Sequence, residues 1–174
     1  RMVRPFVLRR LKRDVLTDLP DKLEECVYAH MEGEQWKLYC AHVQRLKMMI
    51  DKQSEEEFKS AKIQVLAELT KLRQLCCDPS LIYENYENPS AKAAMCLDLI
   101  KNAIEGGHKV LLFSQFTSML ENLQRKLDEE QISYYVLTGA TPKEKRLKLV
   151  ESFNKDDTSV FCISLKAGGR GVNL

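Results

Sequence analysis

The 174-residue sequence has no apolar run close to the roughly 20 residues that cross a bilayer, so it predicts no membrane-spanning helix. Glycine and proline are scarce, at 7 and 5 residues, while 30% of the residues are charged. This composition is typical of a helix-rich globular chain and excludes fibrous and disordered classes. The length suffices for one buried domain with a small appendage, but not for two full-sized lobes.

The six cysteines include no C-x-x-C pair, and most of them lie in apolar stretches. Such cysteines are typical of buried, reduced thiols, and their spacing matches no zinc site, so we predict no metal site. The three histidines, His30, His42 and His108, have no spacing that predicts a nucleophile beside them. We interpret them as structural residues.

The net charge of +2 hides an uneven distribution. Residues 1–13 carry six of the 27 basic residues and none of the 25 acidic ones, so the rest of the chain is net acidic. A basic segment of this kind can bind phosphates. It can equally be a solvated helix face or a strip that docks on a neighbouring part of the protein.

Residues 34–82 predict a hairpin of two helices. Apolar spacings of three and four predict a first helix from Glu34 to Ile50, with one buried stripe along Trp36, Tyr39, Val43, Leu46 and Ile50. Ser54 and Glu57 resemble a capping box for a second helix, whose seam runs along Phe58, Val65, Leu69, Leu72 and Cys76. The preceding residues, 1–33, predict the basic lead-in and a short strand centred on Cys26–Tyr28.

From residue 90 onward, helices and strands alternate. Strands are predicted at 110–113, 134–137 and 160–163, and helices at 90–105, 116–127 and 141–153. The strands are apolar without alternation, which is typical of a parallel sheet with helices on both faces. Thr141 as N-cap and Pro142 at the first helical position mark the start of the last helix. The pattern predicts an α/β fold built on a βαβαβ unit.

In such a fold the carboxyl ends of the strands meet at one edge of the sheet, where ligands bind. Small, hydroxyl, amide and cationic residues follow the three strands, at Ser114–Gln115, Thr138–Gly139 and Ser164–Asn173. Backbone N–H groups at this edge can approach an anion closely. The glycines of 168–171 indicate a tight turn, with or without a ligand, and they match neither the P-loop nor the dinucleotide fingerprint.

Five ordered blocks between Pro5 and Leu174 carry a family resemblance. P-F-V-L-R-R from Pro5, with Leu19–Pro20, resembles the block that opens the second motor lobe of Swi/Snf-type helicase-like ATPases. L-R-Q-L-C-C-D-P from Leu72 is similar to the L-R-x-x-C-x-H-P box of that family. V-L-L-F-S-Q-F-T from Val110 resembles motif IV, and I-S-L-K-A-G-G-R-G-V-N-L from Ile163 resembles motif V. L-T-G-A-T from Leu137 stands where the family has L-D-G-x-T.

Three departures from these motifs stand out: Asp78 replaces the usual His, Thr138 replaces an acidic residue, and Arg170 interrupts the glycine run. The Asp78 change favours a structural role for its box. The C-C-D-P and L-P-D-K variants resemble the bacterial branch of the family, which implies a bacterial cytoplasm; a eukaryotic member would be nuclear. We expect motif VI, which supplies arginine fingers to ATP in this family, to lie beyond Leu174.

The resemblance implies that residues 90–174 are the second RecA-like lobe, with a parallel sheet and flanking helices, of an ATP-dependent double-stranded DNA translocase or remodeller that displaces DNA-bound proteins. ATP and Mg²⁺ would be held mainly by the N-terminal RecA-like lobe of the same protein, so we expect the fragment alone to be inactive and to contain no catalytic residue. The implied partners are double-stranded DNA, that first lobe, and DNA-bound proteins or RNA polymerase; no membrane is implied.

The same resemblance yields the candidate site residues. The predicted DNA-backbone contacts are Ser114, Gln115, Gly139, Ser164, Lys166, Gly168 and Gly169. Gly171 and Asn173 are predicted to lie nearest the nucleotide. Two alternatives stay open: a protein-interaction module that uses the 34–76 hairpin, and a superfamily 2 lobe that acts on RNA.

Overall fold

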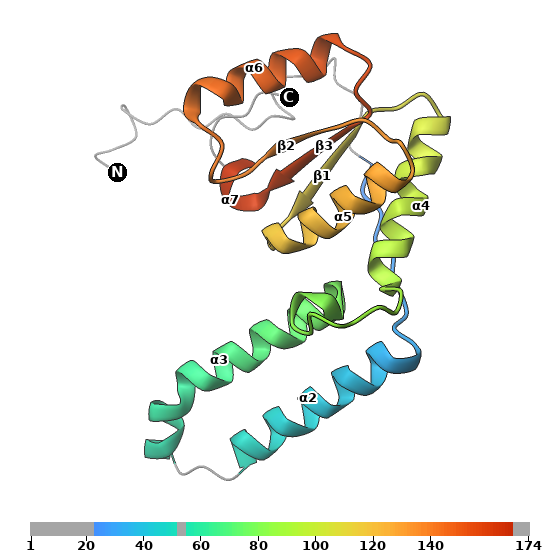
Figure 1. Cartoon of the computed structure of the whole chain (residues 1–174). Coiled ribbons are helices and arrows are strands. Elements are labelled where there is room, and N and C mark those ends of the chain that lie inside the picture. The colour runs from blue at the N-terminus through green and yellow to red at the C-terminus, as the bar shows by residue number, and fades with distance from the viewer. Residues whose placement is uncertain (1–22, 52–54, 169–174) are drawn as a thin grey trace, which may run out of the picture.

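The computed structural model describes residues 23–51 and 55–168, and its helical hairpin projects away from a small α/β sheet (Figure 1). The hairpin consists of α2 (Gly33–Asp51) and α3 (Glu55–Cys77), which run side by side in opposite directions. The 3-10 turn η2 (Pro79–Leu81) follows α3. The predicted hairpin therefore forms, with the first helix within a residue of its predicted bounds.

The fully buried side chains of α2 are polar, and the predicted apolar stripe is wrong at its two ends, although Tyr39, Val43 and Leu46 between them are half-buried. Gln35 and His42 are the buried residues of this helix, whereas Trp36 is 49% exposed and Ile50 is 44% exposed. Gln35 explains the difference, because its Nε2 donates to the Leu75 carbonyl at 2.8 Å and its Oε1 accepts from a backbone N–H at 3.1 Å. These two bonds turn the Gln35 face of α2, and not the neighbouring Trp36 face, toward the rest of the protein.

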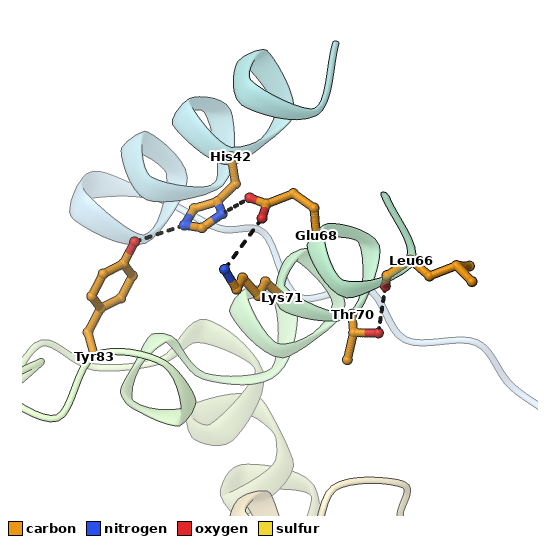
Figure 2. Close-up of polar contacts among 6 residues, drawn as sticks. All are labelled: His42, Leu66, Glu68, Thr70, Lys71 and Tyr83. Carbon is orange, nitrogen blue, oxygen red and sulfur yellow. Dashed lines mark hydrogen bonds and ion pairs between the residues drawn. The ribbon is translucent and has the colours of Figure 1, made fainter. Parts of the chain in front are cut away.

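His42 joins α2, α3 and the loop after η2 (Figure 2). Its Nδ1 lies 2.5 Å from Glu68 Oε1 on α3, and its Nε2 lies 2.8 Å from the Tyr83 hydroxyl. Burial would raise the pKa of Glu68, but the hydrogen bond and charge of His42, together with the charges of Lys71 and Arg45, lower the pKa below its ordinary value. Both ring nitrogens have partners, which confirms the structural interpretation of His42.

Residues 23–32 form no strand, and the prediction of a short strand at Cys26–Tyr28 is wrong. Leu23, Val27 and Tyr28 are exposed, and the only sheet of the described residues contains three other strands. An extended segment becomes a strand only when a neighbouring strand takes its backbone hydrogen bonds. The residues before 23, including the basic lead-in, lie outside the described part of the chain.

The α/β part contains the predicted parallel sheet. The strands β1 (Val110–Ser114), β3 (Val160–Ser164) and β2 (Tyr134–Leu137) pair in the order β1-β3-β2. On one face, α4 (Ala91–Glu105) and α5 (Thr117–Glu129) pack through Ile100, Leu120 and Leu127. On the other face, α6 (Lys143–Lys155) packs through Phe153.

Coverage of both faces is complete for β3 but not for β1. Every residue of β3 is buried, whereas Leu111 is 41% exposed and Phe113 is 47% exposed. These two side chains alternate with Leu112, which faces α4 and α5, so they point to the face that α6 covers. Because α6 lies over β2 and β3, it leaves the edge strand β1 partly open among the described residues.

Candidate functional site

The carboxyl ends of the three strands meet at one edge, as predicted for a parallel sheet. Ser114 pairs in register with Ser164, and Leu137 pairs with Ile163, so the loops that follow these residues are neighbours. The edge brings together six of the predicted site residues: Ser114, Gln115, Gly139, Ser164, Lys166 and Gly168. Gly169, Gly171 and Asn173 lie outside the described residues.

The two serines at this edge are not free at the surface, because Ser114 is hydrogen-bonded within the fold and Ser164 is buried. The Ser114 hydroxyl donates to the Phe116 carbonyl at 3.1 Å and accepts from the Phe116 N–H at 3.2 Å, which closes the turn into α5. Ser164 is only 3% exposed. A phosphate contact from either hydroxyl would require this arrangement to open.

The remaining polar side chains at the edge reach the surface. Gln115 is exposed, and its Oε1 accepts a hydrogen bond from Nη2 of Arg73 on α3. Lys166 is exposed in the short helix α7 (Leu165–Gly168), which follows β3 directly. An amide and a cation therefore lie on two adjacent loops of the same edge.

The loop after β2 is shaped by Thr141 and Arg146. The Thr138 N–H donates to Thr141 Oγ1 at 3.0 Å, and Arg146 Nε donates to the Thr141 carbonyl at 2.9 Å. Thr141 thus closes the turn, and the prediction that it caps α6 is wrong: the N-cap is Pro142, without a side-chain hydrogen bond. Gly139 is exposed at the tip of this loop.

Gly168 is required by packing. A Cβ at this position would lie 2.9 Å from Ile163 Cγ2 and 3.0 Å from Phe113 Cε1, distances that real Cβ atoms rarely show. The absence of a side chain lets α7 lie directly against β1 and β3. The glycine therefore has a structural reason that is independent of any ligand.

A cavity of about 420 Å³ lies beneath the edge, between α3, α4, α5 and β1. Its walls include two cations, Arg73 and Lys92, and among the described residues that line it there is no carboxylate. Three thiols, Cys76, Cys77 and Cys96, also line it, and burial raises the pKa of each. These thiols stay neutral near pH 7, so they are poor nucleophiles.

A second cavity, also of about 420 Å³, lies between the 78–90 loop and α5 and has a different lining. It contains four carboxylates and two cations: Asp78, Glu84, Glu87, Glu129, Arg125 and Lys126. Asp78 is buried, and its Oδ1 accepts from the Ser80 N–H at 2.9 Å, which caps η2. This contact supports the structural role expected for the box that contains Asp78.

Sequence reasoning missed Arg73 and Arg146 as parts of this edge. Arg73 belongs to the L-R-x-x-C-x-H-P-like box, which is the only signal that could have singled it out. Arg146 lies in a run with Lys143, Lys145 and Lys148, where charge alone does not distinguish one cation from another. The carbonyls that Arg146 contacts identify it only in the folded chain.

The described residues contain no group of three or more His, Cys, Asp or Glu side chains placed to hold a metal ion. None of the described helices is both long enough and apolar enough to span a membrane. The residues predicted to lie nearest ATP, Gly171 and Asn173, are outside the described part, and the described edge has no P-loop to hold a nucleotide.

Comparison with known proteins identifies two consecutive domains. Residues 1–81 match the SNF2-related domain, and residues 91–174 match the helicase conserved C-terminal domain. An uncharacterized ATP-dependent helicase of Mycoplasma pneumoniae is 34% identical over 98% of this chain and 16% of its own length. The mouse chromodomain-helicase-DNA-binding protein 1-like is 35% identical over 100% of this chain and 20% of its own length. The chain thus spans at most about a fifth of these relatives.

Solved structures agree with these relatives. The C-terminal domain of the Sulfolobus solfataricus SWI2/SNF2 ATPase superposes with a TM-score of 0.77 at 28% identity, over 88% of this chain and 68% of that one. The core of that ATPase in complex with double-stranded DNA gives 0.73 at 28% identity, over 94% and 36%. The chain therefore belongs to the SNF2 family, and its sheet and helices are the RecA-like fold of the C-terminal lobe of SWI2/SNF2 ATPases.

Proposed function

We propose that this chain is the second motor lobe of an ATP-dependent, DNA-stimulated double-stranded DNA translocase or remodeller that displaces DNA-bound proteins. The observation that carries the proposal is the gathering of exposed Gln115, Gly139 and Lys166 at one edge of a SNF2-type lobe. The structural neighbour bound to double-stranded DNA and the relatives whose names refer to chromatin remodelling support the choice of ligand.

The edge would bind the sugar-phosphate backbone. Lys166 supplies a positive charge, and Gln115 supplies amide donors. The backbone N–H groups of the loop around Gly139, and those of Gly168 and Gly169, are proposed to approach the phosphates. Such contacts position the protein without reading bases, so binding is expected to be sensitive to salt and independent of sequence.

The first RecA-like lobe of the full-length protein would hold ATP and Mg²⁺. Hydrolysis of the ATP would supply the free energy for movement. Within this chain, Gly171 and Asn173 are proposed to approach the nucleotide when the lobes close. The chain by itself is therefore expected to hydrolyse no ATP. We further propose a cytoplasmic location for a bacterial protein and a nuclear one for a eukaryotic protein, since the relatives include both kinds.

The proposal is tested by Lys166→Ala in the full-length protein. We expect weaker binding to duplex DNA, a salt dependence reduced by roughly 0.9 in log-log slope for one lost phosphate contact, and slower DNA-stimulated ATPase. Fluorescence anisotropy in a potassium chloride series measures the first two. An unchanged slope together with an unchanged ATPase rate would contradict the assignment.

Lys155→Ala is the matched control for this test. Lys155 is exposed at the end of α6. This end of α6 lies beside the start of β1, since Nζ of Lys109, the residue before β1, donates to the Phe153 carbonyl at 2.5 Å. Lys155 therefore lies at the opposite edge of the sheet. Removing this charge should leave the DNA affinity and its salt slope almost unchanged.

A second candidate function is protein interaction through the hairpin. The outer face of α3 exposes Ile63, Leu66 and Leu69 at spacings of three, which is an apolar stripe without a partner among the described residues. A motor requires a P-loop and an acidic motif before this region and an arginine-rich motif after it, whereas an interaction module requires none of these. The RNA-directed alternative is tested by letting duplex DNA and RNA compete for binding to the protein. Preference for duplex DNA would exclude a lobe that acts on RNA.

A further inference from the structure

We propose that Arg73 is a positioning residue for DNA binding: it holds the Gln115 carboxamide by its oxygen and thereby presents the NH₂ group of Gln115 to a phosphate. This inference rests on the proposed function, because it concerns the same sheet edge. It adds to that edge a residue from the hairpin, which lies 42 positions away from Gln115 in sequence.

Arg73 is placed by two contacts. Its Nη2 donates to Gln115 Oε1, and its guanidinium carbon lies 6.0 Å from the centroid of the Phe116 ring. Cation–π attraction of this kind restrains the guanidinium plane. Arg73 stands one turn before the end of α3, so the hairpin and the loop after β1 meet at this point.

The chemistry of the pair dictates which end of the amide is free. Arginine has five N–H donors and no acceptor, so only the oxygen of Gln115 can face it. Both N–H bonds of Nε2 then remain for another acceptor, and phosphate oxygens are acceptors only. Without Arg73, the Gln115 side chain can rotate and present its oxygen to the phosphate, which that oxygen cannot bind.

The surroundings favour an anionic ligand. Arg73, Lys92 and Gln115 line one cavity, whose described lining contains no carboxylate that would neutralise the two cations. Both Arg73 and Gln115 are exposed, so the hydrogen bond between them contributes little to stability. Its effect should therefore appear in DNA binding and not in the melting temperature.

A double-mutant cycle in the full-length protein tests the inference. Arg73→Met, Gln115→Leu and the double variant are compared for duplex DNA affinity by anisotropy at several salt concentrations. We expect Arg73→Met to weaken binding about three- to tenfold, the cost of immobilising one long side chain at an interface, with an unchanged salt slope. In the Gln115→Leu background the same substitution should have no further effect. Arg73→Lys, which keeps a donor-only cation, should restore part of the affinity.

Lys62→Met, which removes an exposed charge from the same helix, is the matched control and should change nothing. Equal melting temperatures of all variants exclude a folding defect. Losses that multiply in the double variant, with a slope reduced by roughly 0.9, would mean that Arg73 itself contacts a phosphate and would overturn the inference. An Arg73→Met variant with normal affinity would overturn it as well.

The failure of the proposed function is distinguishable from the failure of this inference. If Gln115→Leu and Lys166→Ala both leave DNA binding unchanged, the edge is not the DNA site and the proposed function is wrong. If Lys166→Ala weakens binding but Gln115→Leu or Arg73→Met does not, the DNA site stands and only the role of Arg73 is overturned.

Discussion

The hairpin and the sheet are held together by different chemistry. The interface between α2 and α3 buries Gln35, His42 and Glu68, and each has a hydrogen-bond partner on another element. The centre of the sheet instead buries the apolar run Val160–Ile163, whose side chains have no exposed surface. The helix α3 also buries Val65, Leu72 and Leu75, so apolar packing contributes to this part as well. The register of α2 relative to α3 and α4 is fixed in addition by directional polar bonds of Gln35. The sheet, which has helices on both faces, depends instead on the volume that its buried apolar side chains fill.

This difference predicts two kinds of sensitivity. A gap in the sheet core costs free energy in proportion to the lost volume, because the surrounding side chains relax only in part. A broken bond in the hairpin costs free energy through the polar partner that is left buried, whereas removing both partners costs much less. Three substitution pairs test this comparison.

The largest effect is expected for Phe161→Ala in β3. Phe161 has no exposed surface, and its ring packs 5.2 Å from the ring centroid of Phe153 and 6.1 Å from that of Tyr135. We expect a loss of about 3–5 kcal/mol in the unfolding free energy of the sheet. Phe113→Ala, at a half-exposed position on the same face, should cost well under half as much. Hydrogen exchange of the strand amides measures both, and equal losses would refute the volume argument.

An intermediate effect is expected for the His42–Glu68 pair. His42→Leu leaves the buried Glu68 carboxylate with Lys71 as its remaining partner, 3.5 Å away, and should cost about 2–3 kcal/mol. The double variant His42→Leu with Glu68→Leu should recover most of that loss, since no buried polar group is left without its partner. Hydrogen exchange of the α2 and α3 amides is the measurement. Losses that simply add would show that the hairpin, like the sheet, depends on packing volume.

The smallest effect is expected for the glycines of the sheet edge. Gly168→Ala should cost about 1–2 kcal/mol, because its Cβ would meet Ile163 and Phe113 at about 3 Å. Gly139→Ala, with no heavy atom within 4 Å of an added Cβ, should change stability by less than about 0.5 kcal/mol. Thermal unfolding of the two variants distinguishes these values. A larger loss for Gly139→Ala would mean that its loop is constrained by something other than packing.

The order of helices and strands was predictable because it depends on local periodicity. Apolar runs without alternation identified all three strands, and spacings of three and four identified both hairpin helices. The strand predicted at Cys26–Tyr28 failed, since a strand also needs a neighbour that periodicity does not supply. The apolar stripe of α2 failed at Trp36, because Gln35 has partners on two other helices and their bonds turn Gln35 inward in its place.

The candidate site was predictable in position but not in detail. Parallel strands must bring their carboxyl ends together, so the loops that begin at Ser114, Thr138 and Ser164 were expected to meet. Whether a given side chain there is free depends on partners from elsewhere in the chain. Ser114 is engaged by the turn into α5, and Gln115 is held by Arg73.

Residue types and their spacing were thus enough to specify the elements, the parallel sheet and the edge where its loops gather, because these follow from the period of each element and from right-handed crossovers. The tertiary structure alone decided which face of α2 is buried and which polar groups at the edge stay available. Those outcomes depend on hydrogen bonds between residues about 40 positions apart, such as Gln35 with Leu75 and Arg73 with Gln115. The local sequence around one residue does not identify partners that are distant along the chain, because only folding brings them into contact.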